Sequence, residues 1–296
     1  MQPRFRIAGL GEILWDVFPD AAHFGGAPAN FSCSAAGVGG ELVDVLMISA
    51  VGNDVEGDRA IEELRKRNVD TSFVQRNGFP TGQVIVELNQ RGEASYRFLE
   101  NIAWDHLHYD AAMEALAKTL DAVCFGTLSQ RAHESEETVH RLIKATRPAC
   151  LKIFDINFRP PYWTPEVVRS TMPLADVLKL NNDEIKVLGT VLELNGSDEE
   201  IARQILQRYS LKWLVLTRGA DGSLIHGKNG ERSEVPGKSV AVVDTVGAGD
   251  AFTAALTVGL LLNRPLTDIH HRASEVAAWT CTQPGATPKF PASLRW

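Results

Sequence analysis

The alternation of helical and strand patterns in the middle of the chain is the feature that most limits its fold. Apolar residues at helical spacing predict helices over 111–120 and 134–146, and apolar runs predict buried strands over 122–126, 151–154 and 212–217. Such alternation is typical of parallel strands joined by helical crossovers. We therefore expect an α/β fold, and 296 residues with 44% hydrophobic content can bury one large core with a small appended subdomain.

Two stretches near the N-terminus add to this pattern. The apolar run Ile7–Leu14 predicts a buried first strand. From Val74 to Phe98 the spacing of apolar residues changes to period two, which predicts a β-hairpin with its turn at 89–92. This hairpin interrupts the helix-strand alternation, so we expect it to stand apart from the main sheet.

A glycine-rich loop leads into a helix at residues 244–256. Gly247 and Gly249 can take backbone angles that are closed to other residues, and Asp250 follows them directly. The first amide groups of the helix lack partners within it, and the positive end of the helix dipole faces the loop, so a phosphate is the usual occupant. Taken alone, the short pattern Gly-x-Gly-Asp is more simply explained by Asp250 as a helix N-cap.

The longer string DTVGAGDAF, residues 244–252, resembles the C-terminal signature of the PfkB, or ribokinase-like, family of carbohydrate kinases. The resemblance implies that Asp250 is the catalytic base and that Gly247, Ala248 and Gly249 form an anion hole with their amides. It also implies a three-layer α/β/α domain with a mostly parallel central sheet and a small β-strand lid. The whole chain, 1–296, would be one kinase domain, with the lid inserted from about 15–25 and 74–104.

The segment FGGAPANF, residues 24–31, resembles the N-terminal signature of the same family, in which glycines and an asparagine bind sugar hydroxyls. This resemblance implies that Gly26 and Asn30 contact an acceptor sugar. Asp16 sits among bulky apolar residues, and a buried carboxylate needs partners, which sugar hydroxyls can supply. The alternative is that Asp16 lies in a surface turn.

Further candidates for sugar contacts come from two segments. In the predicted lid these candidates are Tyr96, Arg97, Asn101 and Trp104, and each is as readily structural, because a strand presents side chains to both faces. The string DINFR, residues 155–159, follows a predicted strand and resembles a segment of fructokinase-like and 2-keto-3-deoxygluconate kinases, which implies roles for Asn157 and Arg159. The alternative for Arg159 is an ion pair with Asp155.

ATP and magnesium follow from three further resemblances. Asn181 and Glu184 match the family's N-x-x-E motif, which organises Mg²⁺ near the ATP phosphates through water, although Asn-x-x-Glu also makes a helix cap. The nucleotide-binding candidates, which match the family's T-x-G-x-x-G segment and a later adenine-binding segment, are Thr217, Gly219, Gly222 and Gly285. Asp244 and the Gly285 region correspond to a monovalent-cation loop in relatives, which implies K⁺ there.

Charge and cysteine content narrow the class of protein. A formal net charge of -7 leaves no general attraction for nucleic acid or for an anionic membrane. The four cysteines show no C-x-x-C spacing, which argues against a zinc site and a disulfide framework and fits a reducing cytoplasm. We expect a cytoplasmic enzyme whose partners are a monosaccharide and ATP, and the lid implies a homodimer.

The sequence predicts a Mg-ATP-dependent sugar kinase. Fructose is the expected acceptor, because Ala27-Pro28 stands where typical ribokinases have Lys-Gly and this version resembles fructokinases. The alternatives are a 2-keto-3-deoxygluconate kinase, suggested by Tyr96-Arg97 and Arg159, and a ribokinase, which the missing lysine disfavours. A catalytically silent sugar or nucleotide sensor on the same fold would be expected to carry a damaged catalytic loop, whereas Asp250 and both glycines are present.

Overall fold

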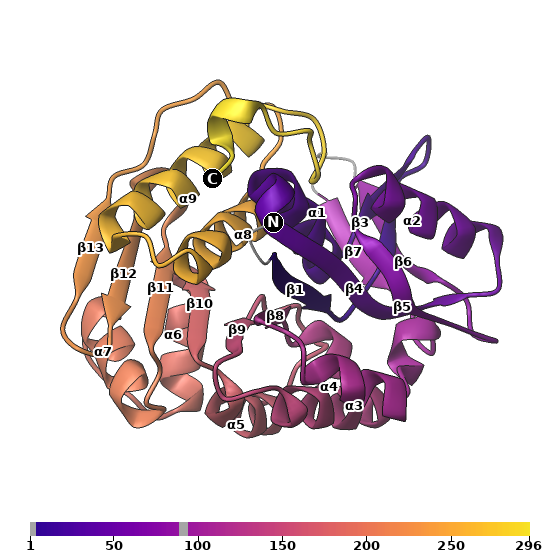
Figure 1. Ribbon diagram of the computed structural model, residues 1–296, viewed down its shortest axis with the longest axis horizontal. Coiled ribbons are helices and arrows are strands. Elements are labelled where there is room, and N and C mark those ends of the chain that lie inside the picture. The colour runs from indigo at the N-terminus through magenta and orange to yellow at the C-terminus, as the bar shows by residue number, and fades with distance from the viewer. Residues whose placement is uncertain (1–3, 89–93) are drawn as a thin grey trace.

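A large, mostly parallel sheet forms the centre of the protein. The computed structural model describes residues 4–88 and 94–296, with the backbone alone for 87, 88 and 94–96. The strands of the large sheet are β1 (Phe5–Leu10), β4 (Val43–Gly52), β5 (Asp70–Asn77), β8 (Ala122–Phe125), β9 (Leu151–Asp155), β10 (Val177–Asn181), β11 (Trp213–Thr217), β12 (Ser223–Gly227) and β13 (Arg232–Val235). Their order is β13-β12-β11-β10-β9-β8-β1-β4-β5, and β12 and β13 are the antiparallel pair that ends it (Figure 1).

Helices cover both faces of this sheet (Figure 1). One face carries α1 (Ala27–Gly39), α2 (Val55–Lys66), α8 (Ala248–Leu261) and α9 (Leu266–Thr280). The other face carries α3 (Ala111–Ala117), α4 (His133–Ala145), α5 (Pro165–Thr171), α6 (Asn182–Val191) and α7 (Asp198–Arg208). Strand side chains alternate between the two hydrophobic cores, and the predicted three-layer α/β/α fold is thereby confirmed.

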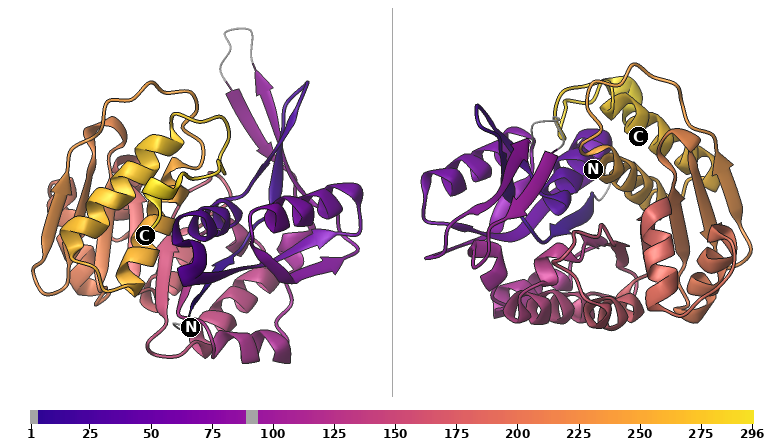
Figure 2. Two further views of the ribbon diagram at one scale, coloured as in Figure 1. Left: turned by 45° about the horizontal axis from the view of Figure 1, so that its top comes forward. Right: turned by 180° about the vertical axis from the view of Figure 1, so that it is seen from behind.

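A second, small sheet projects from the main body (Figure 2). Its strands, in the order β3-β2-β6-β7, are β2 (Leu14–Val17), β3 (Ala22–Gly25), β6 (Gly82–Leu88) and β7 (Ala94–Phe98). The predicted lid boundary at residue 74 is wrong, because residues 74–77 belong to β5 and pair with β4 of the large sheet. The predicted strand Ile7–Leu14 is likewise divided, because β1 ends at Leu10 and β2 begins at Leu14.

Close packing of α1 on β1 brings the start of this helix to the centre of the molecule. A β-carbon at Gly9 would lie 2.4 Å from the carbonyl oxygen of Pro28 and 2.2 Å from Ser32 Oγ, so only glycine permits this approach. The first turns of α1 and α8 thus lie near the carboxyl ends of the central strands, where open α/β sheets bind ligands. Among the helices of the described ranges, none is long and apolar enough to cross a membrane.

Candidate active site

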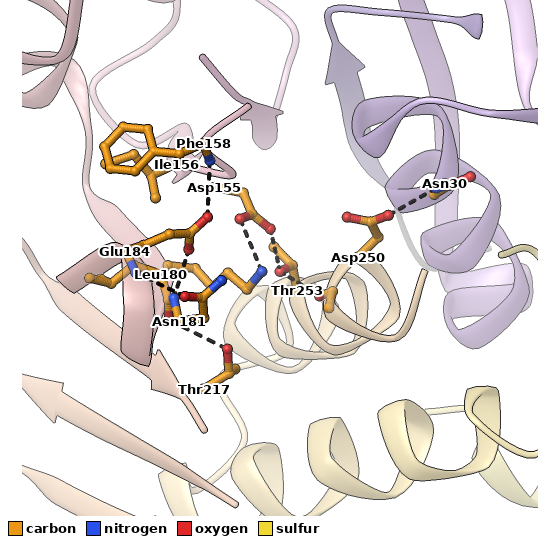
Figure 3. A network of polar contacts seen from close by, with 12 residues as sticks. Asn30, Asp155, Ile156, Phe158, Leu180, Asn181, Glu184, Thr217, Asp250 and Thr253 are labelled. Carbon is orange, nitrogen blue, oxygen red and sulfur yellow. Dashed lines mark hydrogen bonds and ion pairs between the residues drawn. The ribbon is translucent and has the colours of Figure 1, made fainter. Parts of the chain in front are cut away.

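The first turns of two helices that are distant in the sequence meet at Asp250 and Asn30. Asn30 Nδ2 of α1 donates a hydrogen bond to Asp250 Oδ2 of α8 at 3.0 Å (Figure 3). Asn30 is buried, and its Oδ1 has no hydrogen-bond partner within residues 4–88 and 94–296. The structure therefore unites two residues that the sequence placed in separate motifs, and it leaves an acceptor atom beside the carboxylate.

The environment of Asp250 suits a general base. Burial raises the pKa of its carboxyl, and the negative charge of Asp155 raises it further. Lys179, the hydrogen bond from Asn30 and the charge of Arg159 lower the pKa, and the balance is a value of about 6. At neutral pH the group is mostly ionised and still basic enough to take a proton from a hydroxyl in a transition state.

Removing the Asn30 amide is expected to raise the pKa of Asp250, because Nδ2 stabilises the ionised carboxylate. A hydrogen bond to a charged group is worth about 1.5 kcal/mol, which corresponds to a shift of about one pKa unit. In Asn30→Ala we therefore expect the acidic limb of the kcat/KM profile to move about one unit toward higher pH. A limb that stays in place would show that this bond does not set the pKa.

Gly247 and Gly249 are required for different reasons. Gly247, the N-cap of α8, has a φ of 78°, and a β-carbon there would lie 2.4 Å from the carbonyl oxygen of Ala286. Gly249 lies inside α8, so the expectation that it needs unusual backbone angles is wrong. Its constraint is space, because a β-carbon would lie 3.0 Å from Lys179 Nζ.

A buried ion pair lies directly against this loop. Lys179 Nζ donates to Asp155 Oδ1 at 3.0 Å, and the side chains are 9% and 7% exposed. Thr253 Oγ1 lies 3.0 Å from Asp155 Oδ2 and 2.9 Å from the carbonyl oxygen of Gly249 (Figure 3). Burial alone would lower the pKa of Lys179, but Asp155, Glu184 and Asp250 outweigh it and raise the value.

Sequence reasoning did not single out Lys179, which the structure places as a buried cation beside this loop. The signal was a lysine inside the apolar run Val177–Leu180, because a charge within a buried strand needs a partner. The alternative that paired Asp155 with Arg159 is wrong, since Asp155 is bound by Lys179 and Thr253. Arg159 is exposed, and its Nη1 donates to the carbonyl oxygen of Phe158 at 3.2 Å.

Of the predicted acceptor residues, Asn30 contacts Asp250, Gly26 precedes the first turn of α1, and Asp16 lies on the small sheet. Asp16 of β2 is half-buried, and a β-carbon at Gly25 would lie 2.8 Å from its Oδ2, so glycine leaves room for the carboxylate. Burial raises the pKa of Asp16, while Arg159 and His23 lower it. Gly26 has a φ of 107°, and a β-carbon there would lie 2.5 Å from the carbonyl oxygen of Glu12.

Glu12 is a second residue that sequence reasoning overlooked. Its side chain is buried, Oε1 accepts from the amide of Ala27 at 3.3 Å, and Oε2 has no partner in the described part of the chain. Burial raises the pKa of this carboxyl to about 7. Glu12 lines a small pocket together with Asp155, Asn157 and Asp250. A carboxyl directly after a buried strand was the available signal, because its burial has to be compensated.

The candidates on the predicted lid make no hydrogen bond or ion pair with Asp250 or Glu12 in the described part of the chain. Arg97 is exposed on β7, and the Tyr96 side chain lies outside the described residues. Trp104 is 1% exposed beneath the guanidinium of Arg131, 4.1 Å away, so of its two alternatives the structural one applies and Trp104 is a core residue. Asn101 is exposed, and its Oδ1 lies 2.8 Å from His106 Nε2.

Asn181 and Glu184 form a capping box at the start of α6, as the alternative for this motif predicted. Asn181 Oδ1 accepts from the amides of Asp183 and Glu184 at 2.9 Å, and Glu184 Oε2 accepts from the Asn181 amide at 2.7 Å. Glu184 Oε1 accepts from the Phe158 amide at 3.0 Å. Carboxylate lone pairs remain for a hydrated cation, and burial raises the pKa of Glu184 despite the opposing charge of Lys179.

The nucleotide candidates lie on neighbouring elements. Thr217 pairs in register with Asn181, and its Oγ1 lies 3.4 Å from the carbonyl oxygen of Leu180. Gly219 is exposed with a φ of 55°, whereas Gly222 has a φ of 95° and would place a β-carbon 2.1 Å from the Val235 carbonyl oxygen. Gly222 is therefore fixed by the fold, and Gly219 faces open space.

Asp244 and Gly285 are 41 residues apart in the sequence and are in contact in the structure. The Gly285 amide donates to Asp244 Oδ2 at 3.1 Å, and Asp244 Oδ1 accepts from the Val246 amide at 3.0 Å. The bond from Gly285 joins the loop after α9 to the loop before α8. Within residues 4–88 and 94–296, no group of three or more His, Cys, Asp or Glu side chains could hold a metal ion.

Comparison with known proteins agrees with this arrangement. The family model "pfkB family carbohydrate kinase" matches residues 20–293. An uncharacterized sugar kinase from Pyrococcus horikoshii is 31% identical over 98% of this chain and 95% of its own length. Its structure in complex with ATP has a TM-score of 0.81 at 29% identity, covering 95% of this chain and 94% of that chain. A fructokinase from Escherichia coli is 28% identical over 95% of each chain.

Proposed function

Because the chain belongs to the PfkB family of carbohydrate kinases, we propose that it transfers the γ-phosphoryl group of ATP to a primary hydroxyl of a monosaccharide, with fructose as the acceptor. The observation that carries this proposal is the Asp250 carboxylate, which has a pKa of about 6 and lies in the first turn of α8 beside Gly247 and Gly249. A base beside the N-terminal amides of a helix is what phosphoryl transfer to a hydroxyl requires.

In this mechanism Asp250 takes the proton of the acceptor hydroxyl as the phosphoryl group arrives. The amides of Ala248, Gly249 and Asp250 stabilise the negative charge on the phosphate oxygens. Asn30 orients Asp250 through its Nδ2 and offers its unpaired Oδ1 to a sugar hydroxyl. The small sheet excludes water, which would otherwise compete as acceptor.

Magnesium fits the residues at the start of α6. Glu184 would hold it through water, since its carboxylate keeps free lone pairs and Mg²⁺ keeps much of its hydration shell. Asn181, whose amide oxygen already accepts two backbone N–H groups, would position Glu184 by capping α6. When bound, it neutralises charge on the ATP phosphates. We further propose that K⁺ binds at Asp244 and Gly285, which faster turnover in KCl than in NaCl would support. We also propose a homodimer that forms through the small sheet, which a dimeric mass in solution would support.

Fructose as acceptor is supported by the FGGAPANF segment and by the E. coli fructokinase relative. The test is ADP release from Mg-ATP with fructose, ribose and 2-keto-3-deoxygluconate in parallel. Turnover confined to fructose is the expected result. Turnover on 2-keto-3-deoxygluconate would instead assign Arg159 to its carboxylate, and inactivity on every sugar would favour the sensor alternative.

Replacing Asp16 by Ala is expected to weaken sugar binding more than catalysis. A hydrogen bond to a charged group is worth about 1.5 to 3 kcal/mol, so the sugar KM should rise about 10- to 100-fold while kcat changes less. Asp20→Ala is the matched control, because Asp20 is exposed in the turn between β2 and β3. An unchanged sugar KM in Asp16→Ala would remove Asp16 from the acceptor site.

A further inference from the structure

The ammonium group of Lys179 is buried beside the loop that is proposed to receive the phosphate. Within the described residues, its one hydrogen bond goes to Asp155 Oδ1, although an ammonium group has three N–H donors. Nζ would lie 3.0 Å from a β-carbon at Gly249, so the absence of a side chain there leaves the ammonium next to the backbone of the loop. Donor capacity therefore remains at the point where an anion would bind.

Two contacts fix the position of this cation. Asp155 is held from its other side by Thr253 Oγ1, at 3.0 Å from Oδ2. The same hydroxyl lies 2.9 Å from the carbonyl oxygen of Gly249, so the ion pair is attached to the first turn of α8.

The charges around Lys179 also favour a role in binding an anion. The carboxylates that act on Lys179 are those of Asp155, Glu184 and Asp250, which come from β9, α6 and α8. ATP phosphates would add further negative charge at this point. Arg159, the other cation that acts on Asp250, is exposed to solvent, whereas the Lys179 side chain is 9% exposed. A charge in a site of low dielectric constant interacts more strongly than one in water.

We propose that Lys179 is a catalytic residue, whose ammonium donates a hydrogen bond to an oxygen of the phosphoryl group during transfer, while Asp155 and Thr253 hold it in position. The inference rests on the proposed kinase mechanism. As the acceptor oxygen bonds to phosphorus, the bond between phosphorus and the bridging oxygen of ATP breaks, and its electron pair leaves with ADP. The hydroxyl proton goes to Asp250, and Lys179 keeps its own protons throughout.

A purely structural ion pair is the competing explanation, and a paired substitution separates the two. Lys179→Met alone would leave the Asp155 carboxylate buried without a counter-charge and can fail to fold for that reason. The double variant Lys179→Met with Asp155→Asn removes both charges, so its melting temperature should return toward that of the wild type. If Lys179 acts on the phosphoryl group, kcat should still fall by about 10²- to 10³-fold, the range for losing one donor to a developing charge.

The control is Asp155→Asn alone, which keeps the ammonium and should retain more activity than the double variant. A second measurement compares affinity for ADP with aluminium fluoride and fructose, which mimics the transferred phosphoryl group, with affinity for a non-hydrolysable ATP analogue. We expect the double variant to lose affinity for the former much more than for the latter. A folded double variant with wild-type kcat, or an equal loss for both ligands, would overturn the proposal.

These outcomes are distinguishable from failure of the proposed function. If Asp250→Asn keeps the wild-type rate while the Lys179 double variant loses it, the base assignment fails and the role of Lys179 stands. If the wild type phosphorylates no sugar in the panel, the proposed function fails. The ligand-affinity comparison then decides on Lys179 independently, and a wild type that does not discriminate between the two nucleotide ligands overturns this inference as well.

Discussion

Replacing Asp250 by Asn is expected to lower kcat by about 10²- to 10⁴-fold, the usual loss when a general base is removed. The amide keeps the shape of the carboxylate and can still contact Asn30, so the fold and the affinity for ATP should change little. Steady-state kinetics at saturating ATP and sugar measure the effect. Asp110→Asn is a matched control, because Asp110 caps α3 away from the site and should keep full kcat.

The same assignment predicts the direction in which kcat/KM changes with pH. Burial and Asp155 raise the pKa of Asp250 to about 6 against Lys179, Asn30 and Arg159, which lower it. Only the ionised carboxylate accepts a proton, so kcat/KM should fall as the pH drops below about 6, by about tenfold per pH unit. The limb should be absent from the residual activity of Asp250→Asn. Wild-type kcat in this variant would refute the assignment of the base.

Replacing Gly247 by Ala is expected to give the second large effect, a fall in kcat/KM for ATP of about 10²-fold, as for the loss of one anion-hole donor. The residue sits at a φ of 78°, and the new methyl group would lie 2.4 Å from the Ala286 carbonyl oxygen. The loop has to move, so its amides no longer converge on the phosphate. Separate measurements of ATP affinity and of kcat show whether the variant loses nucleotide binding or turnover.

Gly230→Ala is the matched control for backbone strain. Gly230 has a comparable φ of 90° in the exposed turn between β12 and β13, and a β-carbon there would meet nothing within 4 Å. It should lose about 1 kcal/mol of stability and keep full activity. Equal activity losses in Gly247→Ala and Gly230→Ala would show that the loss comes from strain and not from the anion-binding loop.

The sequence predicted those parts of the protein that depend on local patterns. Helix-strand alternation implies a parallel sheet with helices on both faces, and the structure has this three-layer arrangement.

 The contact between Asn30 and Asp250 could also be expected from the sequence, because both residues lie in motifs that the family resemblance assigns to one site.

Other parts depend on tertiary contacts that no local pattern carries. Residues 74–77 alternate like a hairpin strand, but they pair with β4 because that edge of the large sheet is open to them. Trp104 is polar enough at its ring nitrogen to suit a sugar site, yet it is buried under Arg131. The apolar run around Lys179 indicates a buried charge, but the proposed role of Lys179 rests on its distance to Gly249, which only the structure gives.

The most direct test of the account is ³¹P NMR of the product formed from Mg-ATP and fructose, with Asp250→Asn as the matched blank. The account predicts a phosphomonoester coupled to the two protons of a primary carbon, formed in equal amount with ADP by the wild type and strongly reduced in the variant. Formation of ADP with inorganic phosphate alone, or an equal yield of sugar phosphate from Asp250→Asn, would contradict it.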